Sequence, residues 1–323
     1  MTLSNSKIAS KVLSALAEDY AGMPECDDHA GKAWHKLFKK ADELGLLNDE
    51  LLQAMLCERL RSLGDANLRF ERVTDLDTAA APAPCTLAMR GQAAVLTVGN
   101  LDTTQAADAL AANADSVRNA KMLVIDVRAC TGGIEQAAYP LLDWLFDEET
   151  TLAGLIGTQK VLSNYSAGNC KARVEQFGQL KALLQAQGAA DTTSWLDQGI
   201  QVAQDNYGKG YVEEELQPAD IAVKAAPVGQ KVAVLISRAT SDAAEWLAQV
   251  AQKSSRVTLV GEPTCGTLDY SNPVSLAFDG RFVFTYPMSK TVEASQGKGA
   301  RGTGILPGVT CPADEALEQA LSL

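Results

Sequence analysis

The sequence is poor in the residues that mark several classes of function. Its 323 residues include only two histidines, and 28 Lys and Arg residues stand against 40 Asp and Glu residues, which gives a net charge of −12. Nucleic acids and anionic membranes both favour a basic surface, so this balance predicts neither as a partner. No run of apolar residues approaches the length of a membrane span.

Cysteine is present without a pattern. The seven cysteines are scattered and lack a CxxC spacing, which predicts free thiols in a reducing cytoplasm and neither a metal site nor a cofactor. The N-terminus lacks the long apolar core of a signal peptide, because Ile8, Val12 and Leu16 mark one helix face instead. We therefore expect a cytoplasmic protein. No pattern sets its oligomeric state.

The predicted elements divide the chain into three parts. Residues 1–73 indicate three helices that form an N-terminal helical cap, the third starting at an N-cap at Asn48. Residues 74–85, rich in Pro and Ala, predict a linker. From residue 86 to 323, strands alternate with helices, which predicts an α/β core with a mainly parallel sheet. Within this core, about 160–228 is predicted to be a lid or edge insertion. Strands are expected at Leu87–Arg90, Ala94–Val98, Met122–Val127, Leu152–Val161, Val232–Ile236, Arg256–Val260, Pro273–Ala277 and Arg281–Pro287, and helices at Thr104–Asn119, Lys171–Gln187, Thr193–Asp205 and Ala243–Lys253.

The stretch Val232–Thr267 organises this core. A buried strand is followed by a polar turn, Ser237–Asp242, then by a helix, a second strand and the loop Gly261–Thr267. A polar turn that opens a helix at the carboxyl end of a strand is where open α/β sheets place their chemistry. Ser241 or Asp242 is therefore expected at the centre of the site.

Two loops are expected to line the same pocket. Gly132 and Gly133 let the backbone turn with its N–H groups pointing outward, as an oxyanion cradle requires, although a plain tight turn is also consistent with the pair. Cys130 and Cys265 lie on these loops, either as a thiol nucleophile or acid, or as small buried residues. Gly266 completes the set.

The order of the motifs resembles the tail-specific (C-terminal processing) protease family of serine peptidases, which includes the tricorn core and the interphotoreceptor retinoid-binding protein modules. The resemblance implies the Clp protease/crotonase fold. It covers most of the chain from Leu63 onward. The matching pieces are Gly64–Asn67, Asp126–Gly133, Thr240–Glu245, Gly261–Gly266, Asp279–Gly280 and Gly304–Pro307.

The resemblance also implies where the catalytic residues should stand. The family's nucleophilic serine lies three residues before the acidic residue at the helix start, and counting back from Glu245 gives Asp242. The position of the general-base lysine falls on Thr267, and that of the histidine used by another branch falls on Asn67. The chain's own histidines, His29 and His35, lie in the predicted cap, where a surface or packing role is expected.

Three functions follow from this arrangement. In the first, the chain is an enzyme that catalyses a reaction other than peptide hydrolysis, with Asp242 as acid or base beside an oxyanion cradle of Gly132, Gly133 and Ala243. Alternatively it is a pseudopeptidase that binds a small-molecule or peptide ligand, with Asp242 capping its helix. The third alternative is an active serine hydrolase that uses Ser241, and it needs a base that the family positions do not supply.

Overall fold

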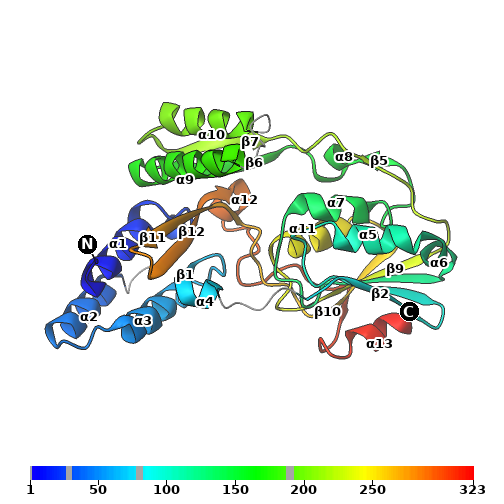
Figure 1. Ribbon diagram of the computed structural model, residues 1–323. Helices are drawn as coiled ribbons and strands as arrows, with labels where there is room; N and C mark the ends of the chain where they lie inside the picture. Colours follow the sequence, from blue (N-terminus) through cyan, green and yellow to red (C-terminus); the bar gives the residue numbers. More distant parts are fainter. Residues whose placement is uncertain (1, 27–30, 78–82, 187–192) are drawn as a thin grey trace. The chain divides into compact units, whose positions relative to one another are not determined.

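The computed structural model of the chain (Figure 1) describes residues 2–26, 31–77, 83–186 and 193–323. Its contacts divide the chain into two compact units, each made of three separate segments. Residues 160–215, within the predicted insertion, belong to the same unit as the predicted cap. The domain boundaries drawn from the sequence stay a prediction. Unit 1 comprises residues 1–79, 160–215 and 269–299, and unit 2 comprises 80–159, 216–268 and 300–323.

Unit 2 is built on a six-stranded sheet in the order β13-β10-β9-β4-β3-β2. All neighbouring pairs are parallel except β2 with β3, which is an antiparallel edge. Central parallel strands are buried on both faces, which explains their nearly continuous apolar sequences. The strands are β2 (Thr86–Arg90), β3 (Ala93–Thr97), β4 (Met122–Asp126), β9 (Lys231–Ile236), β10 (Val257–Gly261) and β13 (Val309–Thr310).

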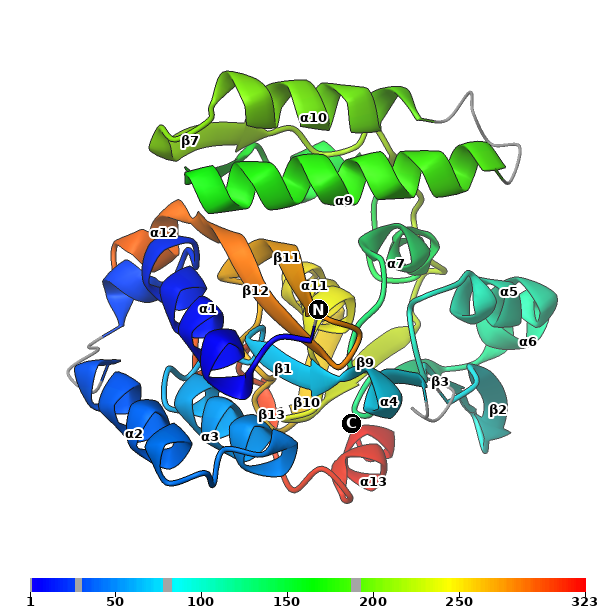
Figure 2. The ribbon, with the colours of Figure 1, turned by 60° about the vertical axis from the view of Figure 1, so that its left-hand side comes forward.

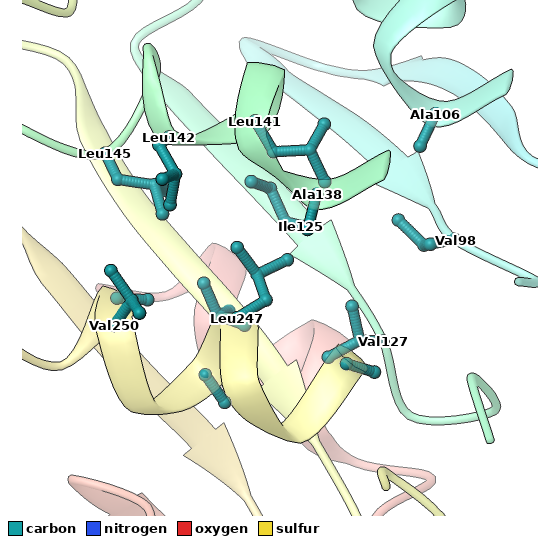
Figure 3. Close-up of a cluster of buried hydrophobic side chains, with 14 of the residues drawn as sticks. Val98, Ala106, Ile125, Val127, Ala138, Leu141, Leu142, Leu145, Leu247 and Val250 are labelled. Carbon is teal, nitrogen blue, oxygen red and sulfur yellow. The ribbon is translucent and has the colours of Figure 1, made fainter. Parts of the chain in front are cut away.

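Helices pack against both faces of this sheet. Along β9, Val232, Val234 and Ile236 join the core beneath one set of helices, whereas Ala233 and Leu235 join the smaller core beneath α13. Figure 3 shows leucines of α7 and α11 converging on the strand that carries Ile125. This packing fixes the starts of α7 and α11, where the candidate site lies. The helices are α5 (Gln105–Ala112), α6 (Ala114–Asn119), α7 (Glu135–Leu142), α11 (Asp242–Ala251) and α13 (Ala316–Leu321).

Unit 1 combines helices with a five-stranded sheet in which β12 pairs with β1, β6 and β11. The predicted helical N-terminal region and the predicted Asn48 cap are both confirmed, since Asn48 accepts from the N–H of Leu51. Figure 2 shows α9 and α10 running beside each other. The elements are α1 (Asn5–Glu18), η1 (Met23–Glu25), α2 (Gly31–Glu43), α3 (Asp49–Arg61), β1 (Arg69–Arg72), α4 (Val73–Asp77), β6 (Gln159–Tyr165), α9 (Ala167–Ala186), α10 (Ser194–Asp205), β7 (Gly210–Leu216), β11 (Tyr270–Phe278), β12 (Phe282–Thr291) and α12 (Val292–Ser295).

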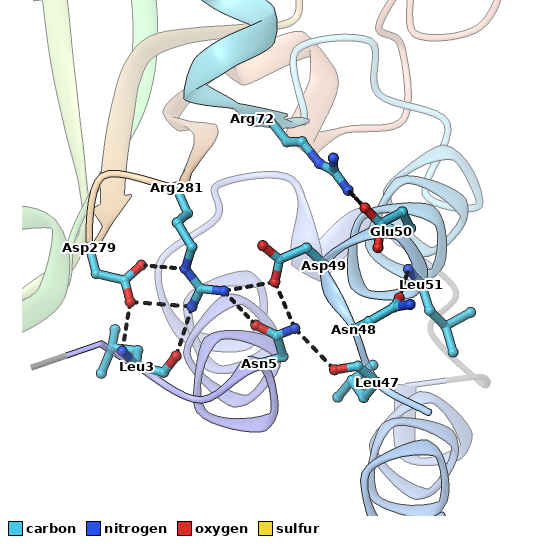
Figure 4. A network of polar contacts seen from close by, with 10 residues as sticks. All are labelled: Leu3, Asn5, Leu47, Asn48, Asp49, Glu50, Leu51, Arg72, Asp279 and Arg281. Atoms are coloured by element: carbon cyan, nitrogen blue, oxygen red, sulfur yellow. Dashed lines mark hydrogen bonds and ion pairs between the residues drawn. The ribbon is translucent and has the colours of Figure 1, made fainter. Parts of the chain in front are cut away.

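The hairpin β11–β12 anchors the N-terminal segment of unit 1. Asp279 and Gly280 have φ angles of 46° and 73°, as a type I′ turn requires, and the strands predicted at Pro273–Ala277 and Arg281–Pro287 pair through this turn as a hairpin. The Arg281 guanidinium donates to the carboxylates of Asp279 and Asp49, and it also donates to the carbonyl of Leu3 (Figure 4). These contacts fasten the first residues of the chain to the hairpin turn.

Several predicted elements were wrong. The strand predicted at Leu152–Val161 holds only from Gln159 onward, where β6 begins. Its first part is the helix α8 (Leu152–Ile156), because Thr151 caps the start of this helix and Gly157, with a φ of 66°, ends it. Two short strands, β5 (Thr150–Thr151) and β8 (Ala222–Val223), flank this region. The helix predicted at Thr104–Asn119 breaks into α5 and α6 at Asn113.

The predicted linker at 74–85 begins as the helix α4, and its residues 78–82 lie outside the described residues. Strand β7 was not predicted. None of the helices within the described ranges has both the length and the apolar character needed to cross a bilayer.

Candidate active site

The candidate site begins at the turn that joins β9 to α11 in unit 2. The Thr240 hydroxyl accepts from the N–H of Ser237 at 3.0 Å and donates to the carbonyl of Val127 at 3.0 Å. Thr240 is fully buried. The turn is therefore tied both to itself and to the end of the neighbouring strand β4, which gives the residues after it a defined starting geometry.

Asp242 is the first residue of α11 and has a left-handed backbone, with a φ of 53°. Residues other than glycine rarely adopt this backbone conformation, because it costs about 1–2 kcal/mol. Residues strained in this way are often found at functional sites. The side chain of Asp242 is exposed and faces Gly132, because its Oδ2 lies 3.0 Å from where a Cβ on Gly132 would stand. The structure thus brings Asp242 and Gly132 together as expected.

Ser241 points elsewhere. It is the extended N-cap of α11, and its hydroxyl donates to the carbonyl of Thr131 at 2.9 Å. A nucleophilic serine instead donates its proton to a base. The observed contact therefore makes Ser241 a brace between the two loops.

Gly132 and Gly133 form the second wall of the site. Gly133 forms an isolated parallel bridge with Leu101, and a Cβ on it would lie 2.2 Å from the carbonyl carbon of Leu101, so only glycine fits. Within the described part of the chain, the N–H groups of Gly132 and Gly133 donate to no protein acceptor, and the same holds for Ala243. These three backbone donors are thus not used within the described part of the chain.

Glu245, one turn into α11, holds the loop that follows β10. Its carboxylate is completely buried and accepts four hydrogen bonds. The donors are the Thr264 hydroxyl, the N–H of Gly266, and both the N–H and the hydroxyl of Thr267. A buried charge is tolerated when it is paired or fully hydrogen-bonded, and here every partner is a donor.

Thr267 connects the hydrogen bonds around Glu245 to Asp242. Its hydroxyl donates to Glu245 Oε2 at 2.7 Å and accepts from the N–H of Asp242 at 2.8 Å. The residue is buried. The loop after β10 is therefore bonded directly to the backbone of the strained residue.

The relationship of the chain to known proteins agrees with this geometry. The model of peptidase family S41 matches residues 92–311, which is more than half of the chain. The chain belongs to peptidase family S41. The resemblance to tail-specific proteases drawn from the sequence is thereby confirmed.

Two solved structures with TM-scores above 0.5 show the same fold at low sequence identity, and a third is similar. A presumptive peptidase from Parabacteroides merdae is 13% identical with a TM-score of 0.59, covering 98% of this chain and 95% of its own. A lipoprotein from Streptococcus agalactiae is 10% identical with a TM-score of 0.54, covering 100% and 96%. A photosystem II D1 C-terminal processing protease is 12% identical with a TM-score of 0.47, covering 97% and 94%. The predicted α/β fold with its crotonase-like core and helical N-terminal region is confirmed.

Asn67, the residue predicted to stand at the family's histidine position, lies in the turn after α3 in unit 1. Its N–H and its side-chain amide both donate to Asp65 Oδ1, at 2.9 and 3.0 Å. A contact of Asn67 with the Asp242 turn stays a prediction. His35 is an exposed residue of α2, and His29 lies outside the described residues.

The two cysteines predicted to line the site, Cys130 and Cys265, differ in burial. Cys130 is buried, its thiol donates to the carbonyl of Gly132, and burial raises the pKa of the thiol to about 11. A thiol with this pKa is protonated at neutral pH and is a weak nucleophile. Cys265 is half-buried, and its N–H donates to the carbonyl of Thr240. Gly266 is buried with a φ of 85°, and its N–H is held by Glu245.

The sequence did not single out Glu135, which starts α7 immediately after the glycines. Desolvation and, secondly, the nearby Asp242 carboxylate raise the pKa of Glu135, although much of its side chain is accessible. Its place at the head of a helix beside a glycine pair was the available signal. Across the described ranges, no group of three or more His, Cys, Asp or Glu side chains is placed to hold a metal ion.

The substitution Asp242→Asn is expected to lower the pKa of Glu135 toward its ordinary value. Removing the neighbouring negative charge removes one of the two causes of the raised pKa. A carboxyl group whose pKa is higher in the folded than in the unfolded protein lowers the stability as the pH rises from the unfolded pKa to the folded pKa. Because the Glu135 pKa is raised less in the variant, the variant should lose less stability than wild type over this pH range. Carbon-13 NMR titration of the Glu135 side chain measures this. An unchanged Glu135 pKa would show that the two carboxylates do not interact.

Proposed function

We propose that this S41 protein acts on a small carbonyl-containing ligand, with Asp242 as the acid or base. The observation that carries the proposal is the placement of Asp242: this residue, rather than Ser241, has the left-handed backbone and faces Gly132. The free N–H groups of Gly132, Gly133 and Ala243 would receive the carbonyl oxygen.

The reaction favoured by these groups is proton abstraction next to a carbonyl. The Asp242 carboxylate takes a proton from the carbon beside the carbonyl, and the electron pair moves to the oxygen to give an enolate. Backbone N–H groups aimed at that oxygen stabilise the developing charge. Protonated Asp242 then returns the proton to carbon, so that no other reactant is consumed. The carboxyl of Glu135, whose pKa is raised by desolvation and by the neighbouring Asp242, lies beside the same site.

Serine hydrolysis is supported less well. The Ser241 hydroxyl donates to a main-chain carbonyl, and Thr267 donates its own proton to Glu245, so neither is arranged as a nucleophile with its base. A fluorophosphonate probe separates the classes. We expect no labelling of the wild-type protein, whereas labelling that disappears in Ser241→Ala would establish a serine hydrolase.

Ligand binding without chemistry is the second candidate. The exposure of Asp242 favours it, because the carboxylate stays in contact with water instead of being enclosed together with a substrate. In that case Asp242 contributes to the helix start and to ligand contact, and the apolar or peptide ligand expected from the sequence would be retained without turnover. Native mass spectrometry of the purified protein would detect a small molecule that remains bound.

The decisive experiment is deuterium exchange. Wild-type protein is incubated in D₂O with acyl N-acetylcysteamine thioesters and with 2-oxo acids, and loss of the carbon-bound proton is followed by proton NMR. We expect catalysed exchange in wild type and a loss of at least 100-fold in Asp242→Asn, in line with the contribution of a general base.

Ser241→Ala is the matched control, since it removes the contact with Thr131 but no group of the proposed reaction, and it should lower the exchange far less than Asp242→Asn does. Equal exchange in Asp242→Asn and wild type would rule out Asp242 as the base. Binding of the probe with no exchange in either protein would support the binding function.

A further inference from the structure

The hydroxyl of Thr267 is hydrogen-bonded to two neighbours, Glu245 and Asp242. A threonine hydroxyl has one proton to donate, and Glu245 Oε2 receives it at 2.7 Å. The oxygen lone pairs then face the N–H of Asp242, which lies 2.8 Å away. The buried carboxylate therefore orients the hydroxyl as an acceptor for this N–H.

The N–H in question belongs to a strained residue. Asp242 has a φ of 53°, a conformation that persists only where surrounding contacts enforce it. One of the contacts that hold it is a chain of hydrogen bonds that runs from Glu245 through Thr267 to the backbone of Asp242. The same carboxylate oxygen also accepts from the N–H of Thr267 at 2.7 Å, which fixes the loop itself.

We propose that Thr267 is a positioning residue, which holds the backbone of Asp242 in its left-handed conformation so that the carboxylate faces Gly132. It touches neither the ligand nor the reacting atoms, and it acts through Asp242. The catalytic consequence rests on the proposed function, whereas the conformational consequence does not. Thr267 thus takes the family's lysine position without taking over the role of a base.

The test compares three proteins: wild type, Thr267→Val and Thr267→Ser. Valine has the shape of threonine without the hydroxyl, whereas serine keeps the hydroxyl without the methyl group. The first readout is the hydrogen-exchange rate of the Asp242 amide, measured by nitrogen-15 NMR. We expect Thr267→Val to raise this rate at least tenfold and Thr267→Ser to leave it within about threefold of wild type.

The second readout is the catalysed deuterium exchange. We expect Thr267→Val to lower kcat at least tenfold, to leave KM within about twofold, and to be rescued by Thr267→Ser. A loss of packing alone would change KM and thermal stability together and would not be rescued by the smaller serine.

The two readouts keep the failures apart. If wild type catalyses no deuterium exchange of the probes, the proposed function fails. The hydrogen-exchange rate of the Asp242 amide still tests whether Thr267 positions Asp242. An Asp242 amide that is unprotected in wild type, or equally protected in Thr267→Val, would overturn the inference. The wild-type measurement requires no variant, so the inference remains testable even if Thr267→Val does not fold.

Discussion

The substitution Glu245→Ala is expected to cause a large loss of stability in unit 2. The Glu245 carboxylate accepts hydrogen bonds from Thr264, Gly266 and Thr267, and these donors are buried. Each buried donor left without a partner costs about 1–3 kcal/mol, so a total of about 3–5 kcal/mol is expected. Chemical denaturation followed by the fluorescence of Trp246, which lies next to Glu245 on α11, measures the free energy of unfolding.

Two companion variants define the cause. Glu245→Gln keeps the shape but replaces one acceptor oxygen with a donor, so it should lose stability without creating a cavity. Glu262→Ala changes a half-buried glutamate at the start of the same loop and should alter the free energy of unfolding by less than about 0.5 kcal/mol. Equal effects at 245 and 262 would mean that the buried hydrogen bonds contribute nothing specific.

The substitution Gly133→Ala is expected to be similarly damaging for a steric reason. Gly133 has a φ of 133°, in a region that is essentially restricted to glycine, and its new Cβ would meet the backbone of Leu101 at 2.2 Å. Backbone strain and overpacking together predict a loss of about 3 kcal/mol or more. The bridge to Leu101 would open, so deuterium exchange at the site should fall as well. Thermal unfolding by calorimetry checks the first effect, and the D₂O assay checks the second.

Gly157→Ala provides the control for Gly133. Its φ of 66° is also left-handed, but no atom lies within 4 Å of the added Cβ. Because its ψ is −179°, Gly157 has a conformation essentially restricted to glycine, and the expected loss is about 1–3 kcal/mol from backbone strain alone. If both alanine variants lose the same stability, the close approach of Leu101 has no energetic weight.

Much of unit 2 was predictable because its signals are local. The strands β4 and β9 are short apolar runs bounded by polar turns, and α11 has its apolar residues at helical spacing. The type I′ turn at Asp279–Gly280 was visible for the same reason, since two adjacent residues determine it. Asp242 was placed by counting from Glu245, and its left-handed backbone was not foreseen.

The wrong predictions of secondary structure arose where flanking residues or distant partners, and not the local apolar pattern, determined the conformation. The apolar run at Leu152–Ile156 indicates a strand, but the cap from Thr151 and the terminating Gly157 make it helical. Strand β7 (Gly210–Leu216) has three consecutive glutamates, and its partner β6 lies far away in the sequence. The bonds of Thr267 could not be derived either, because they depend on where a loop meets a helix start in space.

The division of unit 1 among three segments has a consequence for its synthesis. Leu3 bonds to Asp279, 276 residues later, and β1 pairs with β12 near the end of the chain. The helices at the N-terminus therefore leave the ribosome long before the hairpin that completes their core exists. Contacts of such long range make folding slow and leave apolar surface uncovered in the meantime. Nascent chains that stop before residue 269 should therefore depend on chaperones, and any contiguous fragment that contains the whole of unit 1 also contains large parts of unit 2.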